Sequence, residues 1–226
     1  MVNELDGRPV ITCRTADPES IREAVALLRE GRLAILPTDT VYGVVADVRR
    51  EDAVLALSAA KGRGPTVPLQ LLFGDAGEML TRYAVLTREA RLLIDGLGPG
   101  GWTIITGVVE GWRSPALAGG NTVGFRIPAS RSVREVVEQL GAPLAASSAN
   151  RHGEPSPPTC ADACEQVGDA CAIALDDGAT PVGLDSTVID CAGAETRILR
   201  EGAVDRQTVA RILGLHEIPV LRSIRP

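Results

Sequence analysis

Residues 33–43 have the sequence Leu33-Ala34-Ile35-Leu36-Pro37-Thr38-Asp39-Thr40-Val41-Tyr42-Gly43, an apolar run followed by a polar turn. The apolar run stops at Pro37, which is typical of a short buried strand. The turn after it carries hydroxyl groups and a carboxylate. Because α/β sheets hold ligands where strands end, the stretch predicts an α/β protein whose site begins at this turn.

The same alternation of helical and strand patterns continues along the 226 residues. We expect helices at 21–30, 51–60, 76–83, 87–97, 131–140, 159–167 and 205–213. We expect strands at 33–36, 67–73, 102–109, 122–127, 143–146, 172–175, 186–190 and 197–199. No repeat or linker interrupts this order, so the sequence predicts one mixed α/β domain over residues 1–226, with a core from about 20 to 213 and a tail at 214–226.

Composition limits the classes of function. The net charge is −6 and only 3% of residues are aromatic, which argues against a protein that lives on nucleic acid. A local basic groove leaves weak RNA binding open. The first six residues lack the apolar core of a signal peptide, and no apolar run is long enough for a membrane span. We therefore expect a cytoplasmic protein without a membrane partner.

The five cysteines include no C-x-x-C pair, which disfavours a disulfide framework or a zinc ribbon. Cys160 and Cys164 have the i, i+4 spacing at which a helix could present two metal ligands. Of the histidines, only His152 and His216 could join them, and neither is close in sequence. We favour buried or idle thiols and predict no metal ligands from the protein.

Lys61 is the only lysine among 23 basic residues. Its retention suggests a position where a compact ammonium group is needed and a planar guanidinium does not fit. A chance lysine on an exposed helix end is the alternative interpretation.

Hydroxyl groups and cations recur near the ends of the predicted strands. Each alone is typical of a turn or a helix cap. Together they would form an anion-binding pocket, since polyphosphates need cations with N–H and O–H donors, and a carboxylate suits an arginine fork. Any Mg²⁺ could be carried by the phosphates with few protein ligands. There is no P-loop motif, and the G-x-G-x-x-G string at residues 96–101 follows a helix instead of a strand, so we reject a dinucleotide site.

Five motifs in order give a more specific indication. They are Pro37–Gly43, Lys61-x-Arg63 followed by Pro68-Leu69, Ser148-x-Asn150 with Ser156-Pro157, residues 183–190 and residues 198–203. Between about residue 20 and residue 213 the chain resembles the YrdC-like family, the threonylcarbamoyl-AMP synthases. The resemblance implies a twisted, mixed β-sheet flanked by helices, with a cationic cavity at the strand ends.

The resemblance also implies an activity, in which L-threonine, bicarbonate and ATP give threonylcarbamoyl-AMP and pyrophosphate. The product would serve downstream proteins that transfer threonylcarbamoyl to tRNA, forming N6-threonylcarbamoyladenosine. Matching positions imply threonine contacts at Thr40, Arg126, Ala146 and Ser186. They imply ATP contacts at Arg63, Val67, Thr122, Ser148, Asn150, Ser156 and Arg200. We expect Lys61 and Arg63 to act in catalysis by neutralising phosphate charge as pyrophosphate leaves.

Three positions depart from the family pattern. Leu72 stands where many members have a histidine that contacts threonine, Gly64 stands where a proline usually follows K-x-R, and Gly98 replaces a common tryptophan. Two alternatives stay open. One is an enzyme that forms a carbamoyl-adenylate from carbamoyl phosphate, and the other is a non-catalytic RNA-binding module, which salt-dependent RNA binding without ATP turnover would favour.

Overall fold

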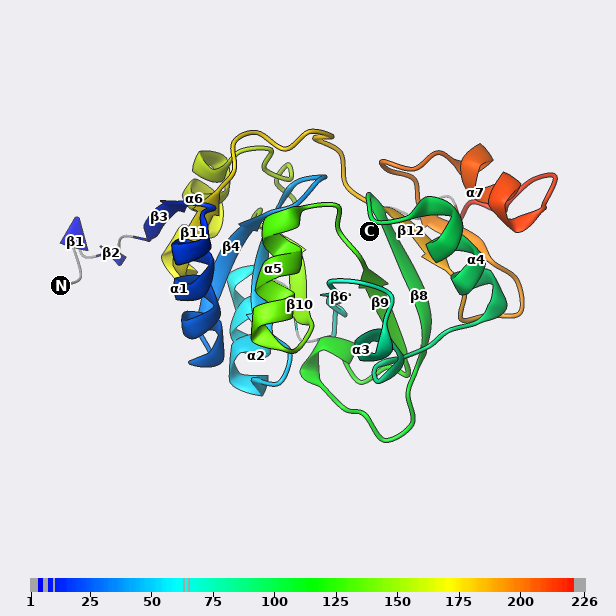
Figure 1. The fold of residues 1–226 in the computed structure, drawn as a ribbon, viewed down its shortest axis with the longest axis horizontal. Coiled ribbons are helices and arrows are strands. Elements are labelled where there is room, and N and C mark those ends of the chain that lie inside the picture. Colours follow the sequence, from blue (N-terminus) through cyan, green and yellow to red (C-terminus); the bar gives the residue numbers. More distant parts are fainter. Residues whose placement is uncertain (1–3, 6–7, 10, 63, 65, 222–226) are drawn as a thin grey trace.

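The computed structural model describes residues 4–5, 8–9, 11–62, 64 and 66–221 (Figure 1). Its strands are β1 (Glu4–Leu5), β2 (Arg8–Pro9), β3 (Thr12–Thr15), β4 (Leu33–Pro37), β5 (Tyr42–Asp47), β6 (Gln70–Leu72), β7 (Ala84–Val85), β8 (Trp102–Val108), β9 (Thr122–Arg126), β10 (Leu144–Ser148), β11 (Cys171–Asp176), β12 (Thr187–Asp190) and β13 (Arg197–Arg200). Its helices are α1 (Pro18–Arg29), α2 (Glu51–Ala60), α3 (Glu78–Thr81), α4 (Arg88–Leu97), α5 (Arg131–Leu140), α6 (Cys160–Val167) and α7 (Arg206–Leu213), with short 3-10 helices η1 (Pro115–Leu117) and η2 (Gly168–Ala170).

Eleven strands of the described residues form one mixed sheet. Its order is β13-β12-β8-β9-β6-β10-β5-β4-β11-β3, and the short strand β7 pairs with the C-terminal end of β8. The sheet contains antiparallel pairs such as β4–β5 and β8–β9 and parallel pairs such as β6–β9 and β3–β11. The predicted α/β class with a mixed sheet flanked by helices is confirmed.

Helices pack on both faces of this sheet, and on one face they leave part of it open. Apolar side chains of α2, α4, α6 and α7 share one core cluster with inward residues of the long sheet, including Trp102, Ile104 and Phe125. On the opposite face, α1 and α5 contact each other and cover β4 and its neighbours (Figure 1). Their cluster reaches β6 at Leu72 and β10 at Ala146. Beyond these residues, β8, β9 and β12 present a mixture of polar, small and apolar side chains on this face, and this is where the cavity described below lies.

Capping side chains fix where several helices begin. The Asp17 carboxylate accepts hydrogen bonds from the amides of Glu19 and Ser20, and the Ser130 hydroxyl accepts one from the amide of Val133. Such acceptors satisfy amide groups that have no partner within the helix. Helices predicted at 51–60 and 131–140 have these bounds in the structure. No helix within the described ranges is both long enough and apolar enough to cross a bilayer.

Three expectations about local structure were wrong. Residues 42–47 form β5, although the sequence was interpreted as a turn through Gly43; β5 pairs with β4 and completes a hairpin. The strand expected at 67–73 is only Gln70–Leu72, since the Leu69 amide leaves the sheet to donate to Ala116. The helix expected at 76–83 is only Glu78–Thr81, because the Asp75 carboxylate accepts from the Gly77 amide and holds a turn there.

Candidate active site

A cavity of about 230 Å³ lies on the part of the sheet face that α1 and α5 leave open. Side chains of β6, β8, β9, β10, β12 and β13 line it, together with the turn between β4 and β5. Mid-strand residues such as Ile105 and Gly124 contribute, so the cavity extends across the sheet face and is not confined to strand ends.

The four residues expected to contact threonine all line this cavity: Thr40, Arg126, Ala146 and Ser186. Of the residues expected to hold ATP, Thr122, Ser148 and Arg200 line it as well. The structure therefore brings together side chains from segments that are far apart along the chain, as the motif order implied.

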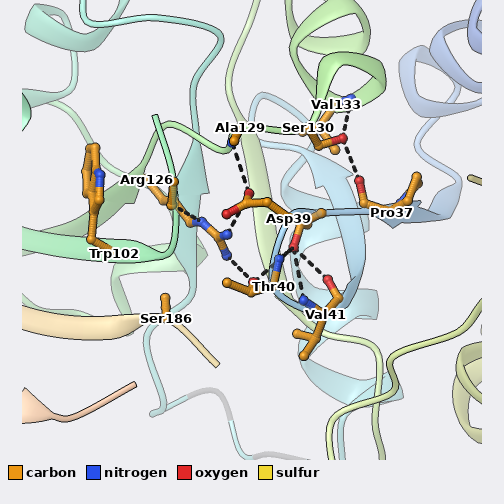
Figure 2. A network of polar contacts seen from close by, with 12 residues as sticks. Pro37, Asp39, Thr40, Val41, Trp102, Arg126, Ala129, Ser130, Val133 and Ser186 are labelled. Atoms are coloured by element: carbon orange, nitrogen blue, oxygen red, sulfur yellow. Dashed lines mark hydrogen bonds and ion pairs between the residues drawn. The ribbon is translucent and has the colours of Figure 1, made fainter. Parts of the chain in front are cut away.

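Arg126 is the most constrained cation of the cavity, with 2% of its surface exposed. Figure 2 shows its guanidinium between Asp39 and Thr40: Nη1 donates to Thr40 Oγ1 at 2.7 Å, and Nη2 lies 2.8 Å from Asp39 Oδ1. Nε donates to the Gly100 carbonyl at 2.9 Å. Burial lowers the pKa of Arg126 and Asp39 opposes that shift. Because arginine stays protonated in proteins, the cavity has a fixed cation in its wall.

One nitrogen of Arg126 has unused hydrogen-bonding capacity. Nη2 is buried, and no acceptor among the described residues is aligned with its N–H bonds, although the Asp39 charge is close. Asp39 Oδ1 also accepts from the Ala129 amide at 2.9 Å. A buried donor without an aligned acceptor is costly, so an anionic acceptor that reached this nitrogen would offset that cost.

The turn before β5 holds Thr40 against Arg126. Thr38 Oγ1 donates to the Val41 carbonyl at 2.6 Å and accepts from the amides of Thr40 and Val41 (Figure 2). Threonine hydroxyl groups commonly close such turns by bonding to their own backbone. Thr38 is therefore part of the site's support, and the polar turn found in the sequence has a structural cause.

Two residues in this network, Gln70 and Thr103, were not identified from the sequence. Arg200 Nη2 donates to Ser186 Oγ at 3.2 Å and to the Ser186 carbonyl at 2.8 Å. Thr103 Oγ1 lies 2.8 Å from Ser186 Oγ and donates to Gln70 Oε1 at 2.8 Å. Because the Thr103 proton goes to Gln70, Ser186 is the donor to Thr103. Both could have been found from the alternation of polar and apolar residues along a strand. Each directly precedes an apolar residue that points into the core, so its own side chain must face the opposite side of the sheet.

Lys61 lies behind the cavity wall and is fully buried. Its ammonium group donates to the Ser148 carbonyl at 2.5 Å, to the Asn150 carbonyl, and to Asn150 Oδ1 at 2.8 Å. Ser148 Oγ also donates to Asn150 Oδ1. Lys61 and Asn150 thus fix the segment that presents Ser148 to the cavity. A direct contact between Lys61 and phosphate stays a prediction.

The remaining predicted residues are at the margin of the cavity. Ser156 Oγ donates at 3.0 Å to Asp185, a carboxylate that lines the cavity and lies 3.7 Å from Arg200 Nη1. Val67 is exposed one residue before Pro68, which lines the cavity. Arg63 lies outside the described residues.

Leu72, one of the three departures from the family pattern, has an apolar environment in the structure. Its side chain is 1% exposed and packs in the apolar cluster beneath α1 and α5. It pairs across the sheet with Arg126, so at the position where a threonine contact was expected it offers no polar group.

Comparisons with known proteins identify the family of this chain. The model of the Sua5/YciO/YrdC family, described as "Telomere recombination", matches residues 26–202. A protein of Mycobacterium tuberculosis (strain H37Rv) is 35% identical over 204 residues, covering 88% of this chain and 94% of that protein. The threonylcarbamoyl-AMP synthase of Bacillus subtilis (strain 168) is 32% identical over 201 residues, covering 88% of this chain and 58% of that protein.

A solved structure gives the same result in three dimensions. The Sua5 protein of Pyrococcus abyssi, crystallised in complex with L-threonine, superposes with a TM-score of 0.86 at 31% identity, over 94% of this chain and 62% of that protein. This chain thus spans about 60% of two of these proteins and nearly all of the third. By its sequence and its fold, the chain belongs to the Sua5/YciO/YrdC family.

Proposed function

We infer that this chain is an L-threonylcarbamoyladenylate synthase, which converts L-threonine, bicarbonate and ATP into threonylcarbamoyl-AMP and pyrophosphate. The observation that carries the proposal is the buried Arg126 at the wall of a cavity lined by hydroxyl groups. The relatives named threonylcarbamoyl-AMP synthase support the reaction, and the threonine complex of the P. abyssi protein supports the substrate.

Threonine would bind with its carboxylate on Arg126. The guanidinium is held by Thr40, Gly100 and Asp39, so it is positioned before the ligand arrives. Its Nη2 supplies the donor that a carboxylate can use. Thr40 and Ser186 offer hydroxyl groups to the rest of the amino acid, and the Ala146 backbone lies in the same wall. Pre-positioned charges of this kind bind without the cost of reordering side chains.

ATP would occupy the other side of the cavity, along Thr122, Ser148 and Arg200, with Asn150, Ser156, Val67 and Arg63 completing the site. The threonine amine and bicarbonate condense to a carbamate with loss of water. A carbamate oxygen then attacks the α-phosphorus, the bond from that phosphorus to the β-bridging oxygen breaks, and pyrophosphate leaves with the electron pair. Such transfers depend on positioning and on neutralising phosphate charge, so no protein nucleophile is required.

In this proposal Arg200 neutralises phosphate charge, and we expect Lys61 and Arg63 to do the same. Mg²⁺ on the phosphates would add to it. Asp185 faces the cavity but already accepts from Ser156, which fits an ion held mainly by ATP. Within the proposal, the enzyme works in the cytoplasm, and proteins that transfer the threonylcarbamoyl group to tRNA consume its product.

The direct test is pyrophosphate release from ATP and bicarbonate, measured with and without L-threonine. We expect release to require threonine and to fall in an Arg126→Lys variant. An Arg131→Lys variant is the matched control, because the Arg131 side chain is 87% exposed and pairs with Glu135 on its own helix. Threonine-independent release would overturn the proposal. Salt-dependent RNA binding without any ATP turnover would instead favour an RNA-binding module.

A further inference from the structure

Three of the five cysteines lie together at the edge of the sheet that is far from the cavity. They are Cys13 on β3 and the pair Cys160 and Cys164 on α6, and their sulfur atoms all lie within 4.8 Å of one another. β3 is at one end of the strand order, whereas the strands that line the cavity are near the other end. The cluster therefore does not belong to the proposed active site.

The fold explains why residues so distant in sequence meet here. β3 pairs in parallel with β11, and the register places Cys13 opposite Ala174. Ala174 faces the core cluster that contains Cys160, and α6 packs against β11 on that face. Cys13 consequently points to the helix, where i, i+4 spacing stacks Cys160 and Cys164 on one side. The sequence revealed only the helical pair because the third thiol depends on this long-range strand pairing.

The sulfur separations match those of ligands around one ion. Cys13 Sγ lies 3.6 Å from Cys164 Sγ, and Cys160 Sγ lies 3.9 Å from Cys164 Sγ. Tetrahedral zinc with Zn–S bonds of about 2.3 Å holds its sulfur ligands about 3.8 Å apart. A disulfide would need a separation of about 2.05 Å, so the present positions suit a shared metal better than a covalent bridge.

We propose that Cys13, Cys160 and Cys164 form a binding site for a thiophilic d¹⁰ metal ion, with Zn²⁺ as the expected occupant. Thiolate sulfur selects soft and borderline ions over Mg²⁺ or Ca²⁺. Cys13 is exposed, which gives the ion an entry path and leaves the fourth position to water.

The ion would link the edge strand β3 to helix α6. Cys13 and Cys164 are 151 positions apart in sequence, so a shared ion closes a long loop. Binding to the folded state alone raises stability by mass action. The expected consequence is a Zn²⁺-dependent rise in the melting temperature, with no change in the residues around the cavity.

The experiment uses the full chain, reduced and freed of metal, in equilibrium dialysis with Zn²⁺ and in titration with Co²⁺. We expect one equivalent of Zn²⁺ and a sulfur-to-cobalt charge-transfer band, both lost in Cys13→Ser and Cys164→Ser variants. A Cys191→Ala variant is the control, because Cys191 lies in the core outside the cluster. Cys13 is exposed, so its replacement tests binding without disturbing the core.

Three outcomes would overturn the proposal: no Zn²⁺ uptake by the reduced chain, a stoichiometry that the two serine variants leave unchanged, or a Cys13–Cys164 disulfide in a protein that takes up no metal after reduction. A melting temperature that rises with Zn²⁺ in the wild type and in the Cys191→Ala variant, but not in Cys13→Ser, would support it.

Discussion

Replacing Arg126 by lysine tests the threonine site while keeping a positive charge beside Asp39. The substitution removes the fork that now donates to Thr40 and Gly100, and with it the Nη2 donor proposed for the threonine carboxylate. Alanine would be a poorer choice, because breaking a buried ion pair costs about 3–5 kcal/mol and would unfold part of the sample. Asp39 is only 11% exposed, so it needs the cation.

The expected effect on binding follows from the hydrogen bond between Nη2 and the threonine carboxylate, which lysine cannot make. A hydrogen bond between charged groups contributes about 1.5–3 kcal/mol. Its removal therefore weakens threonine binding by roughly 10- to 150-fold, at about 1.4 kcal/mol for each factor of ten. ATP contacts other residues in the proposal, so the dissociation constant for ATP should change little.

Calorimetric titration with L-threonine and with L-threoninamide, which lacks the carboxylate charge, completes a double-mutant cycle. The wild type should discriminate strongly against the amide, and Arg126→Lys should discriminate weakly. Arg131→Lys should behave as the wild type. A folded Arg126→Lys protein that binds threonine within about twofold of the wild type, or that still rejects the amide, would refute the assignment.

Other substitutions test the support of the site. Lys61→Ala leaves the Asn150 side-chain oxygen and two carbonyls without this donor, so we expect a lower melting temperature and slower pyrophosphate release; undiminished release would remove Lys61 from the mechanism. Gly202→Ala places a methyl group 2.8 Å from the Ser186 carbonyl oxygen and should reduce activity, whereas Gly193→Ala meets only ordinary contacts and should not. Burial raises the pKa of Cys191 from 9.0 to about 11, so the unfolded thiol ionises first. Stability measured by urea unfolding should fall as pH rises from 9.0 to about 11, with a smaller fall in Cys191→Ala; an equal fall would contradict the burial argument.

Much of the fold could be predicted because local patterns agree with the tertiary structure. The apolar run at residues 33–36 is a buried strand, and helix bounds follow capping residues such as Asp17 and Ser130. Strand β5 was missed because the polar turn before it was extended to Gly43, and only the pairing with β4 shows where the turn ends. Short elements such as β3 depend on long-range pairing and carry no local signal.

Several residues of the candidate site could be predicted because they match the family motifs. The contacts between them could not, because they join segments that are distant in sequence. Thr40 and Ser186 stand in the quoted motifs and Arg126 at a matching position, so the resemblance pointed to all three before the structure placed them around one cavity. The Asp39 ion pair with Arg126 joins residues that are far apart in sequence, and Thr103 enters the network only because β8 and β12 are neighbours. Lys61 was expected at the phosphates because it is the only lysine of the chain and because it stands in the Lys61-x-Arg63 motif. The structure adds a supporting role that composition could not reveal, since it depends on the position of Asn150.

Transfer of isotopically labelled bicarbonate into an adenylate is the reaction by which the proposed enzyme can be recognised. The enzyme, ATP, Mg²⁺ and labelled bicarbonate are incubated with or without L-threonine, and AMP-containing products are separated and analysed by mass spectrometry. We predict that labelled threonylcarbamoyl-AMP forms only with threonine present, in step with pyrophosphate. Pyrophosphate release without threonine, or an adenylate that carries no label, would contradict the account.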